Sequence, residues 1–161
     1  MADSIASLQP TRVYSARKIP NGFFTNTSQL ETTPITITNN IAVSYVWTNL
    51  TVSPGSNPLS GVRGTLFHVK ALFSTGTAQT VTFTFQGVTV TYNATTQQIS
   101  CNGVSNSLAP VGGNIQLEII VDRKTIEIFG NHGQLYMPLP ADNPASTSLL
   151  SVGCSGGNAT F

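Results

Sequence analysis

Apolar residues recur at every second position along most of the chain, which is the period of a β-strand that buries one face. This alternation predicts strands at 35–51, 65–74, 81–85, 88–92, 99–101, 115–121, 126–129, 134–137 and 149–153. Loops are predicted where Pro, Gly and other turn residues gather, at 53–64, 102–114 and 138–147. No segment has the period of a long amphipathic helix, so the pattern predicts a chain of short strands and turns.

The predicted strands follow one another at intervals of about 8–12 residues, which is typical of antiparallel β-sandwiches. The chain has 161 residues, long enough for one domain to bury a two-layer core. We therefore expect an all-β fold, a two-sheet antiparallel sandwich of the jelly-roll or concanavalin-like kind, with residues 1–161 as a single module. Residues 1–34 are expected to be an irregular, linker-like N-terminal segment, because three prolines and little alternation occur there.

The composition narrows the partners that this module could bind. Charged residues make up only 8% of the chain and the net charge is +1, with Thr, Ser and Asn in place of the missing charges. No cluster of basic residues exceeds the pairs Arg17-Lys18 and Arg123-Lys124, which argues against nucleic acid as a partner. No apolar run approaches the roughly 20 residues that cross a bilayer, so no membrane segment is expected. A neutral, hydroxyl-rich surface fits neutral ligands such as sugars.

The cysteines and the N-terminus leave the compartment open. Cys101 and Cys154 are compatible with one disulfide or with two free thiols. The first residues, MADSIASLQP, lack the basic and apolar regions of a signal peptide.

The segment NIQLEIIVDRKTIEIFGNHGQLYM, residues 114–137, carries the most specific pattern and predicts a hairpin. Its turn is DRKT, in which Asp122 occupies the first position and its carboxylate can accept backbone N–H groups. This turn pairs Val121 with Ile126, and it places the apolar residues of both strands on one face, toward the core. The other face carries Glu118, Ile120, Asp122, Glu127 and Phe129.

Half of the six acidic residues of the chain therefore lie on one hairpin face, with Arg123 at the turn. Carboxylates accept hydrogen bonds from vicinal hydroxyls and a guanidinium donates them in a rigid fork, so this group is suited to binding a sugar. The structural alternative is that Asp122 only caps its turn, Glu127 only pairs with Arg123, and Glu118 faces water. The pattern alone leaves both interpretations open.

Other chemistry is less well supported by the residues. An acid and base pair of a glycosidase needs a site that excludes water, and a hairpin tip does not provide one. The histidines His68 and His132 have no second His or Cys at ligand spacing, so no transition metal and no cofactor are expected. A structural Ca²⁺ held by turn carboxylates and carbonyls is the remaining alternative. Trp47 shares parity with Tyr45 and is interpreted as a core residue.

The run VDRKTIEIFGNHGQLYM resembles the C-terminal β-sandwich module of glycoside hydrolase family 32, the invertases, inulinases and levanases. There the pattern V-D-R, two or three further residues, then E-x-F-x-N-x-G recurs. The same run is similar to carbohydrate-binding module family 66, and FHVKALF looks like an early strand of the family 32 module. The resemblance covers about residues 60–161. Related modules usually run one strand past the Gly-Gly segment at 156–157, whereas here 149–153 is the last predicted strand.

The resemblance implies a non-catalytic module that recognises terminal fructosyl units of levan or inulin and targets an attached β-propeller glycosidase, outside the cell. The propeller's catalytic motifs do not occur here, so no catalytic residue and no metal ligand are expected. The expected ligand contacts are Asp122, Arg123 and Glu127 at the motif's charged positions, Arg63 before an early strand, and Tyr136 and His132 at the rim.

Two alternatives remain beside this expectation. The module could be a purely structural domain that packs against the propeller of a β-fructosidase through Ile120 and Phe129 and binds no ligand. An adhesin-like or pilus-like sandwich would share the composition, but it would not explain the hairpin motif.

Overall fold

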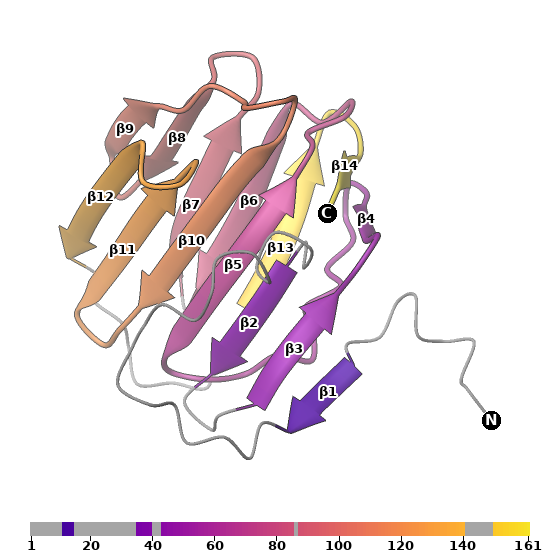
Figure 1. The fold of residues 1–161 in the computed structure, drawn as a ribbon, viewed down its shortest axis with the longest axis vertical. Coiled ribbons are helices and arrows are strands. Elements are labelled where there is room, and N and C mark those ends of the chain that lie inside the picture. The colour runs from indigo at the N-terminus through magenta and orange to yellow at the C-terminus, as the bar shows by residue number, and fades with distance from the viewer. Residues whose placement is uncertain (1–10, 15–34, 40–42, 86, 141–149) are drawn as a thin grey trace.

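The fold was obtained as a computed structural model that describes residues 11–14, 35–39, 43–85, 87–140 and 150–161. These residues form strands and turns without any helix (Figure 1). The strands are β1 (Thr11–Tyr14), β2 (Ile35–Asn39), β3 (Val43–Trp47), β4 (Thr51–Val52), β5 (Phe67–Phe73), β6 (Thr80–Phe85), β7 (Val88–Asn93), β8 (Gln98–Cys101), β9 (Val104–Ser107), β10 (Ile115–Val121), β11 (Thr125–Gly130), β12 (Leu135–Pro140), β13 (Leu150–Ser155) and β14 (Ala159–Thr160). The described part accordingly contains no helix that could cross a membrane.

Two antiparallel sheets form the body of the molecule. The larger sheet has the strand order β1-β3-β2-β5-β10-β11-β12, and the smaller has the order β13-β6-β7-β8-β9. The larger sheet lies in front of the smaller in Figure 1, and the short pair β14-β4 lies at one side of both. The predicted all-β, two-sheet antiparallel sandwich is confirmed.

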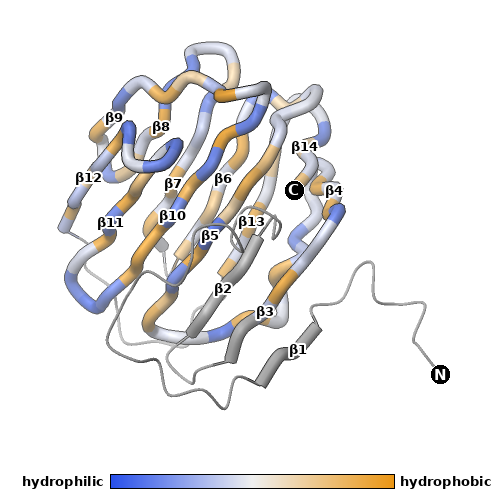
Figure 2. Tube along the Cα trace, viewed as in Figure 1, coloured by the Kyte–Doolittle hydropathy of each residue, from blue (hydrophilic) through white to orange (hydrophobic). Residues whose placement is uncertain are grey.

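The core lies between the sheets because alternate residues of each strand point inward. In β5 and in β10 buried and half-buried residues alternate without interruption, and Figure 2 shows apolar and polar residues alternating over the first part of both strands. Aromatic rings of β5 contact rings of β6 across the core, with centroids 6.0 Å apart for Phe67 and Phe85 and 6.3 Å apart for Phe73 and Phe83. Trp47 is 3% exposed, which confirms its interpretation as a core residue. The hydrophobic period of two thus fixes which face of each strand is buried.

A C-terminal segment that the alternation did not predict closes one side of the sandwich. After Gly156 and Gly157 the short strand β14 pairs with β4, and Phe161 and Leu50 exchange two backbone hydrogen bonds of 3.0 and 2.8 Å. The Phe161 ring lies 5.1 Å from that of Phe73 and is 5% exposed. Backbone hydrogen bonds to Leu50 and Ser74, with the buried side chains of Ala159 and Phe161, anchor this segment, which is too short for alternation to reveal.

Three further predictions about strands were wrong. β1 lies within the segment expected to be irregular, while the rest of residues 1–34 falls outside the described residues. β9 lies within a segment predicted as a loop. The prediction missed this strand because all of its residues are exposed, so no apolar alternation marks it. β12 continues to Pro140, past the predicted start of a loop at Pro138. Proline is tolerated there because β12 is an edge strand and needs no N–H on its outer side.

The two cysteines are free thiols. Cys101 lies in β8 and Cys154 in β13, and β6 and β7 separate these strands in the smaller sheet. Strand spacings of about 4.8 Å place their Cα atoms roughly 14 Å apart, beyond the approximately 7 Å limit of a disulfide. The disulfide that the sequence left open is therefore not formed in this fold.

Candidate functional site

The hairpin of β10 and β11 has the predicted register. Val121 pairs with Ile126, and Ile120 pairs with Glu127. At the turn the Asp122 N–H donates to the carbonyl oxygen of Thr125 at 2.9 Å, and Asp122 Oδ1 accepts the N–H of Arg123 at 2.6 Å. Asp122 therefore caps its own turn, as the structural alternative expected, and its carboxylate is held at an exposed tip.

Two rows of outward side chains cross the neighbouring strands β5, β10, β11 and β12. Antiparallel register places residues of distant sequence opposite one another, about 5 Å apart from strand to strand. The rows are Lys70, Glu118, Phe129 and Tyr136, and His68, Ile120, Glu127 and Pro138. We call this set the outer face. It contains two of the three hairpin carboxylates, Glu118 and Glu127, within the sheet, whereas Asp122 lies at the hairpin tip.

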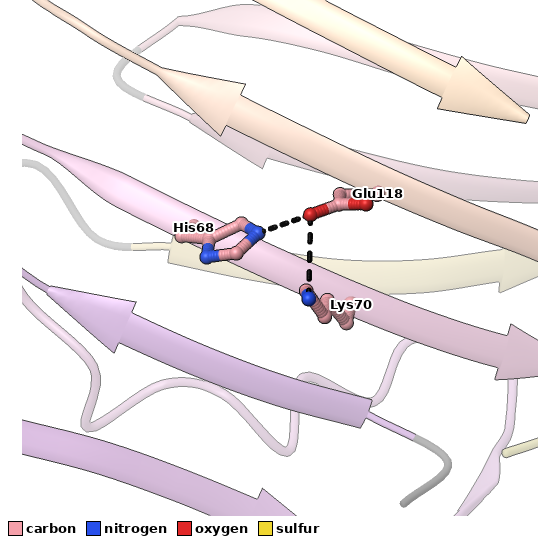
Figure 3. A network of polar contacts seen from close by, with 3 residues as sticks. All are labelled: His68, Lys70 and Glu118. Carbon is pink, nitrogen blue, oxygen red and sulfur yellow. Dashed lines mark hydrogen bonds and ion pairs between the residues drawn. The ribbon is translucent and has the colours of Figure 1, made fainter. Parts of the chain in front are cut away.

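A charged cluster that the sequence did not predict lies on this outer face. His68 Nε2 is 2.6 Å from Glu118 Oε1, and Lys70 Nζ is 3.4 Å from the same oxygen (Figure 3). The hydrogen bond from His68, with the charge of Lys70 added, lowers the pKa of Glu118 against the opposing effect of burial. Glu118 does not simply face water. The sequence did place His68 and Lys70 two residues apart, on one side of β5. This spacing points to a cluster with Glu118 only when β10 is known to pair with β5.

Two aromatic rings lie next to this cluster. Phe129 and Tyr136 are stacked with centroids 4.8 Å apart and an interplanar angle of 26°. Tyr136 is 54% exposed, whereas Phe129 is half-buried beneath it. Exposed aromatic rings with a fixed orientation are suited to contact the apolar face of a ligand that also carries polar groups.

The structure gathers some of the predicted site residues and separates others. Asp122 and Arg123 form the hairpin tip, and Glu127 follows in β11 on the same side. Arg63 is exposed and precedes β5 at this same end of the sheet, because the first residue of β5 pairs with Val121.

The two rim residues lie farther away. Tyr136 is the second residue of β12, two residues before Pro138, which is the residue opposite Glu127. His132 is exposed in the turn after β11, at the opposite end of that strand and roughly 16 Å from the tip at about 3.3 Å per residue. His132 therefore does not converge with the others. In the described part of the chain, no ion pair within 4.0 Å joins Glu127 to Arg123.

Part of the recognised motif has a structural role. Asn131 is 2% exposed, its Oδ1 accepts the N–H of Gln116 at 3.0 Å, and its Nδ2 donates to the carbonyl oxygen of Ala109 at 2.6 Å. A side chain at Gly130 would approach Leu108 Cδ1 to 2.7 Å. The Gly-Asn pair thus fixes a turn and a neighbouring loop, a role that no pattern in the sequence indicated.

The described residues contain no group of three or more His, Cys, Asp or Glu side chains that could hold a metal ion. The carboxylates of the outer face are instead paired with cations or lie beside apolar groups. Its chemistry is that of hydrogen bonding and stacking.

Comparison with known proteins gives one family. The family model for the glycosyl hydrolases family 32 C terminal matches residues 26–137, well over half of the chain. A levanase of Bacillus subtilis (strain 168) is 29% identical over 173 residues, which span 89% of this chain and 26% of the levanase. The crystal structure of exo-inulinase from Aspergillus awamori shares the fold, with a TM-score of 0.56 and 21% identity over 68% of this chain and 27% of the other.

The chain thus corresponds to about a quarter of the length of either relative. The matched region includes the V-D-R hairpin, the Gly-Asn turn and most of the larger sheet. With the sandwich fold and the family match in agreement, the chain belongs to the family of C-terminal domains of family 32 glycosyl hydrolases.

Proposed function

We propose that this chain is a non-catalytic carbohydrate-binding module that recognises terminal fructosyl units of a fructan, levan or inulin. In this proposal it is part of a secreted β-fructosidase and keeps the attached catalytic β-propeller on its polymer. The names of a levanase and an exo-inulinase among the similar proteins support a fructose polymer as the ligand.

One observation carries the proposal: Glu127, Asp122 and Arg123 lie together at one end of an accessible sheet face. Glu127 is half-buried between Ile120 and Pro138, while Asp122 and Arg123 are exposed at the adjoining tip. Carboxylates accept hydrogen bonds from sugar hydroxyls and the guanidinium donates them, so the group matches a ring with vicinal hydroxyls. In a chain with 8% charged residues, such a concentration favours a specific role.

The carboxylates of this face do not support hydrolysis by the module itself. A general acid needs a raised pKa, whereas the pKa of Glu118 is lowered by its hydrogen bond to His68 and by Lys70. Glu127 and Asp122 lie on an open face and at a tip, where water competes for the substrate. We therefore assign catalysis to the attached domain and binding to this one.

Isothermal titration of the 161-residue chain with levan, inulin and fructose tests the proposal. Glu127→Gln and Arg123→Ala are expected to weaken binding at least tenfold, while Lys124→Ala, at the same turn, should change it less than twofold. Asp122→Asn is preferable to Asp122→Ala, because the amide oxygen retains an acceptor for the turn. Absence of binding by the wild-type chain to all three sugars would refute the proposal.

The alternative is a structural domain that binds no ligand and packs against its catalytic partner. The half-buried apolar residues Ile120 and Phe129, beside charged groups of the same face, favour it. Under this alternative Ile120→Asp would impair association with the propeller domain, and no titration would give heat with a fructan.

A further inference from the structure

The charged cluster of the outer face leaves one hydrogen-bonding position open. His68 and Lys70 both contact Glu118 Oε1, and in Figure 3 the second oxygen points away from both. Among the described residues that second oxygen, Oε2, has no hydrogen-bond or ion-pair partner. The Glu118 side chain is 32% exposed. It is therefore held in one orientation by one oxygen and presents the other as an acceptor.

The aromatic pair lies directly beside this acceptor. Glu118 is opposite Phe129 in the register, and Phe129 is opposite Tyr136, so adjacent members of the row are about 5 Å apart. Sugar rings combine an apolar face, which stacks on an aromatic ring, with hydroxyls that need acceptors and donors at the ring edge. Lys70 and His68 carry further N–H donors next to the acceptor.

From these contacts we propose a second sugar subsite on the outer face, in which Tyr136 stacks on a ring and Glu118 accepts its hydroxyls. This inference rests on the proposed function and extends it. The hairpin tip with Glu127 takes the terminal unit, and the neighbouring subsite takes the next units of the same chain. His68 and Lys70 are positioning residues that hold Glu118.

The proposal has a distinctive consequence: affinity rises with the length of the sugar chain. A module with the hairpin site alone would bind fructose and a fructo-oligosaccharide of four units with similar affinity per chain end. A module with both subsites gains contacts with each unit that reaches Tyr136 and Glu118. If the cluster only neutralised Glu118 on a half-covered face, its loss would change stability and leave this length dependence intact.

The test is titration of the whole chain with fructose and with fructo-oligosaccharides of two to five units. We expect the wild type to bind the tetramer at least fivefold more tightly than fructose. Glu118→Gln should abolish this gain and keep fructose affinity within twofold, and Tyr136→Ala should abolish the gain as well. Val111→Ala is the matched control, because Val111 has the same 54% exposure as Tyr136 outside the outer face. Circular dichroism and thermal unfolding of each variant verify that the fold is retained.

The positioning residues have their own measurement. Lys70→Met should reduce the gain with chain length, and Lys70→Arg should retain it, whereas a merely stabilising Lys70 would affect both ligands equally. If Glu118→Gln and Tyr136→Ala keep the full gain while Glu127→Gln weakens fructose binding, the subsite is wrong and the proposed function stands. If the wild type binds neither fructose nor oligomers, both are wrong.

Discussion

The two ends of β11 carry the two halves of one recognised motif, and they are built differently. At one end, the turn with Asp122 and Arg123 is exposed and is held by a short bond from Arg123 N–H to Asp122 Oδ1, 2.6 Å long. At the other end, Asn131 is 2% exposed and its side chain bonds to Gln116 and to Ala109. Only the first turn has charged side chains that a ligand can reach.

The two turns show that a motif that is continuous in the sequence need not form one site in the structure. The buried side-chain amide of Asn131 connects β10 to the preceding loop. The backbone of Asn131 is in the left-handed region, with φ of 45°. Buried polar groups with complete hydrogen bonding stabilise one arrangement of a fold, while exposed charged groups contribute little to folding and remain available for binding. We therefore expect substitutions at the two ends to separate stability from affinity.

The largest effect on stability is expected for Asn131→Ala. It leaves the N–H of Gln116 and the carbonyl of Ala109 without their partner and puts alanine at positive φ, which together should cost about 3 kcal/mol of unfolding free energy. Urea denaturation measures the change. The matched control is Asn102→Ala, where Asn102 also has positive φ, at 48°, but is exposed and donates one bond to Pro140.

The control isolates the contribution of burial. Asn102→Ala is expected to cost about 1 kcal/mol, since water can replace its bond. Equal losses for the two asparagines would contradict the role given to the buried turn. Fructan affinity, measured at a temperature where both variants are folded, should be unchanged by Asn102→Ala.

Much of the fold could be predicted because a strand with one buried face has alternating apolar and polar residues. β5 and β10, both fully alternating, were located to within two residues, and the hairpin register followed from one turn. β9 could not be found, since an exposed edge strand has no apolar period, and β14 consists of two residues held mainly by Phe161 and backbone bonds. Hydrophobic periodicity therefore identifies strands that have a buried face. It does not identify strands that are held mainly by backbone hydrogen bonds.

The site was predictable only within the hairpin. Asp122, Arg123 and Glu127 are near one another in sequence and share one side, so local rules placed them together. Glu118 and His68 are 50 residues apart in the sequence, and their contact depends on the register between β5 and β10, which no local pattern specifies. His132 was grouped with the hairpin by its position in the chain, although a whole strand separates it from the tip.

A smaller effect is expected at the exposed turn. Asp122→Ala removes the acceptor of the Arg123 N–H and should cost about 1 kcal/mol of unfolding free energy. Asp122→Asn keeps an oxygen at this position and should restore most of the loss. The same pair separates folding from binding: under the proposed function, Asp122→Asn retains stability and still binds fructan less tightly, because the charge is gone. Unfolding in urea and titration of the same samples provide both numbers.

The smallest effect concerns Glu118, which lies on the outward face of β10 between the two turns. Its pKa is lowered from the ordinary value of 4.5, mainly by the hydrogen bond from His68, and Lys70 is the other charged group that contacts it. The ionised carboxylate therefore stabilises the folded chain above pH 4.5, and this contribution is lost as the pH falls through the lowered pKa. For a partly exposed group the contribution should be about 1 kcal/mol or less.

The measurement is the difference in unfolding free energy between the wild type and Glu118→Gln at a series of pH values from neutral to about 3. The difference should be largest near neutral pH and shrink toward zero in acid, because the protonated carboxyl and the amide then make similar contacts. Glu127→Gln is the control on the same face, where no ion pair within 4.0 Å is present among the described residues, and its difference should stay small throughout. A gap for Glu118→Gln that did not change with pH would show that packing, and not charge, accounts for the cluster. The charged cluster would then have a structural role, like the buried turn at Asn131, and not a role that depends on charge, like the exposed turn at Asp122.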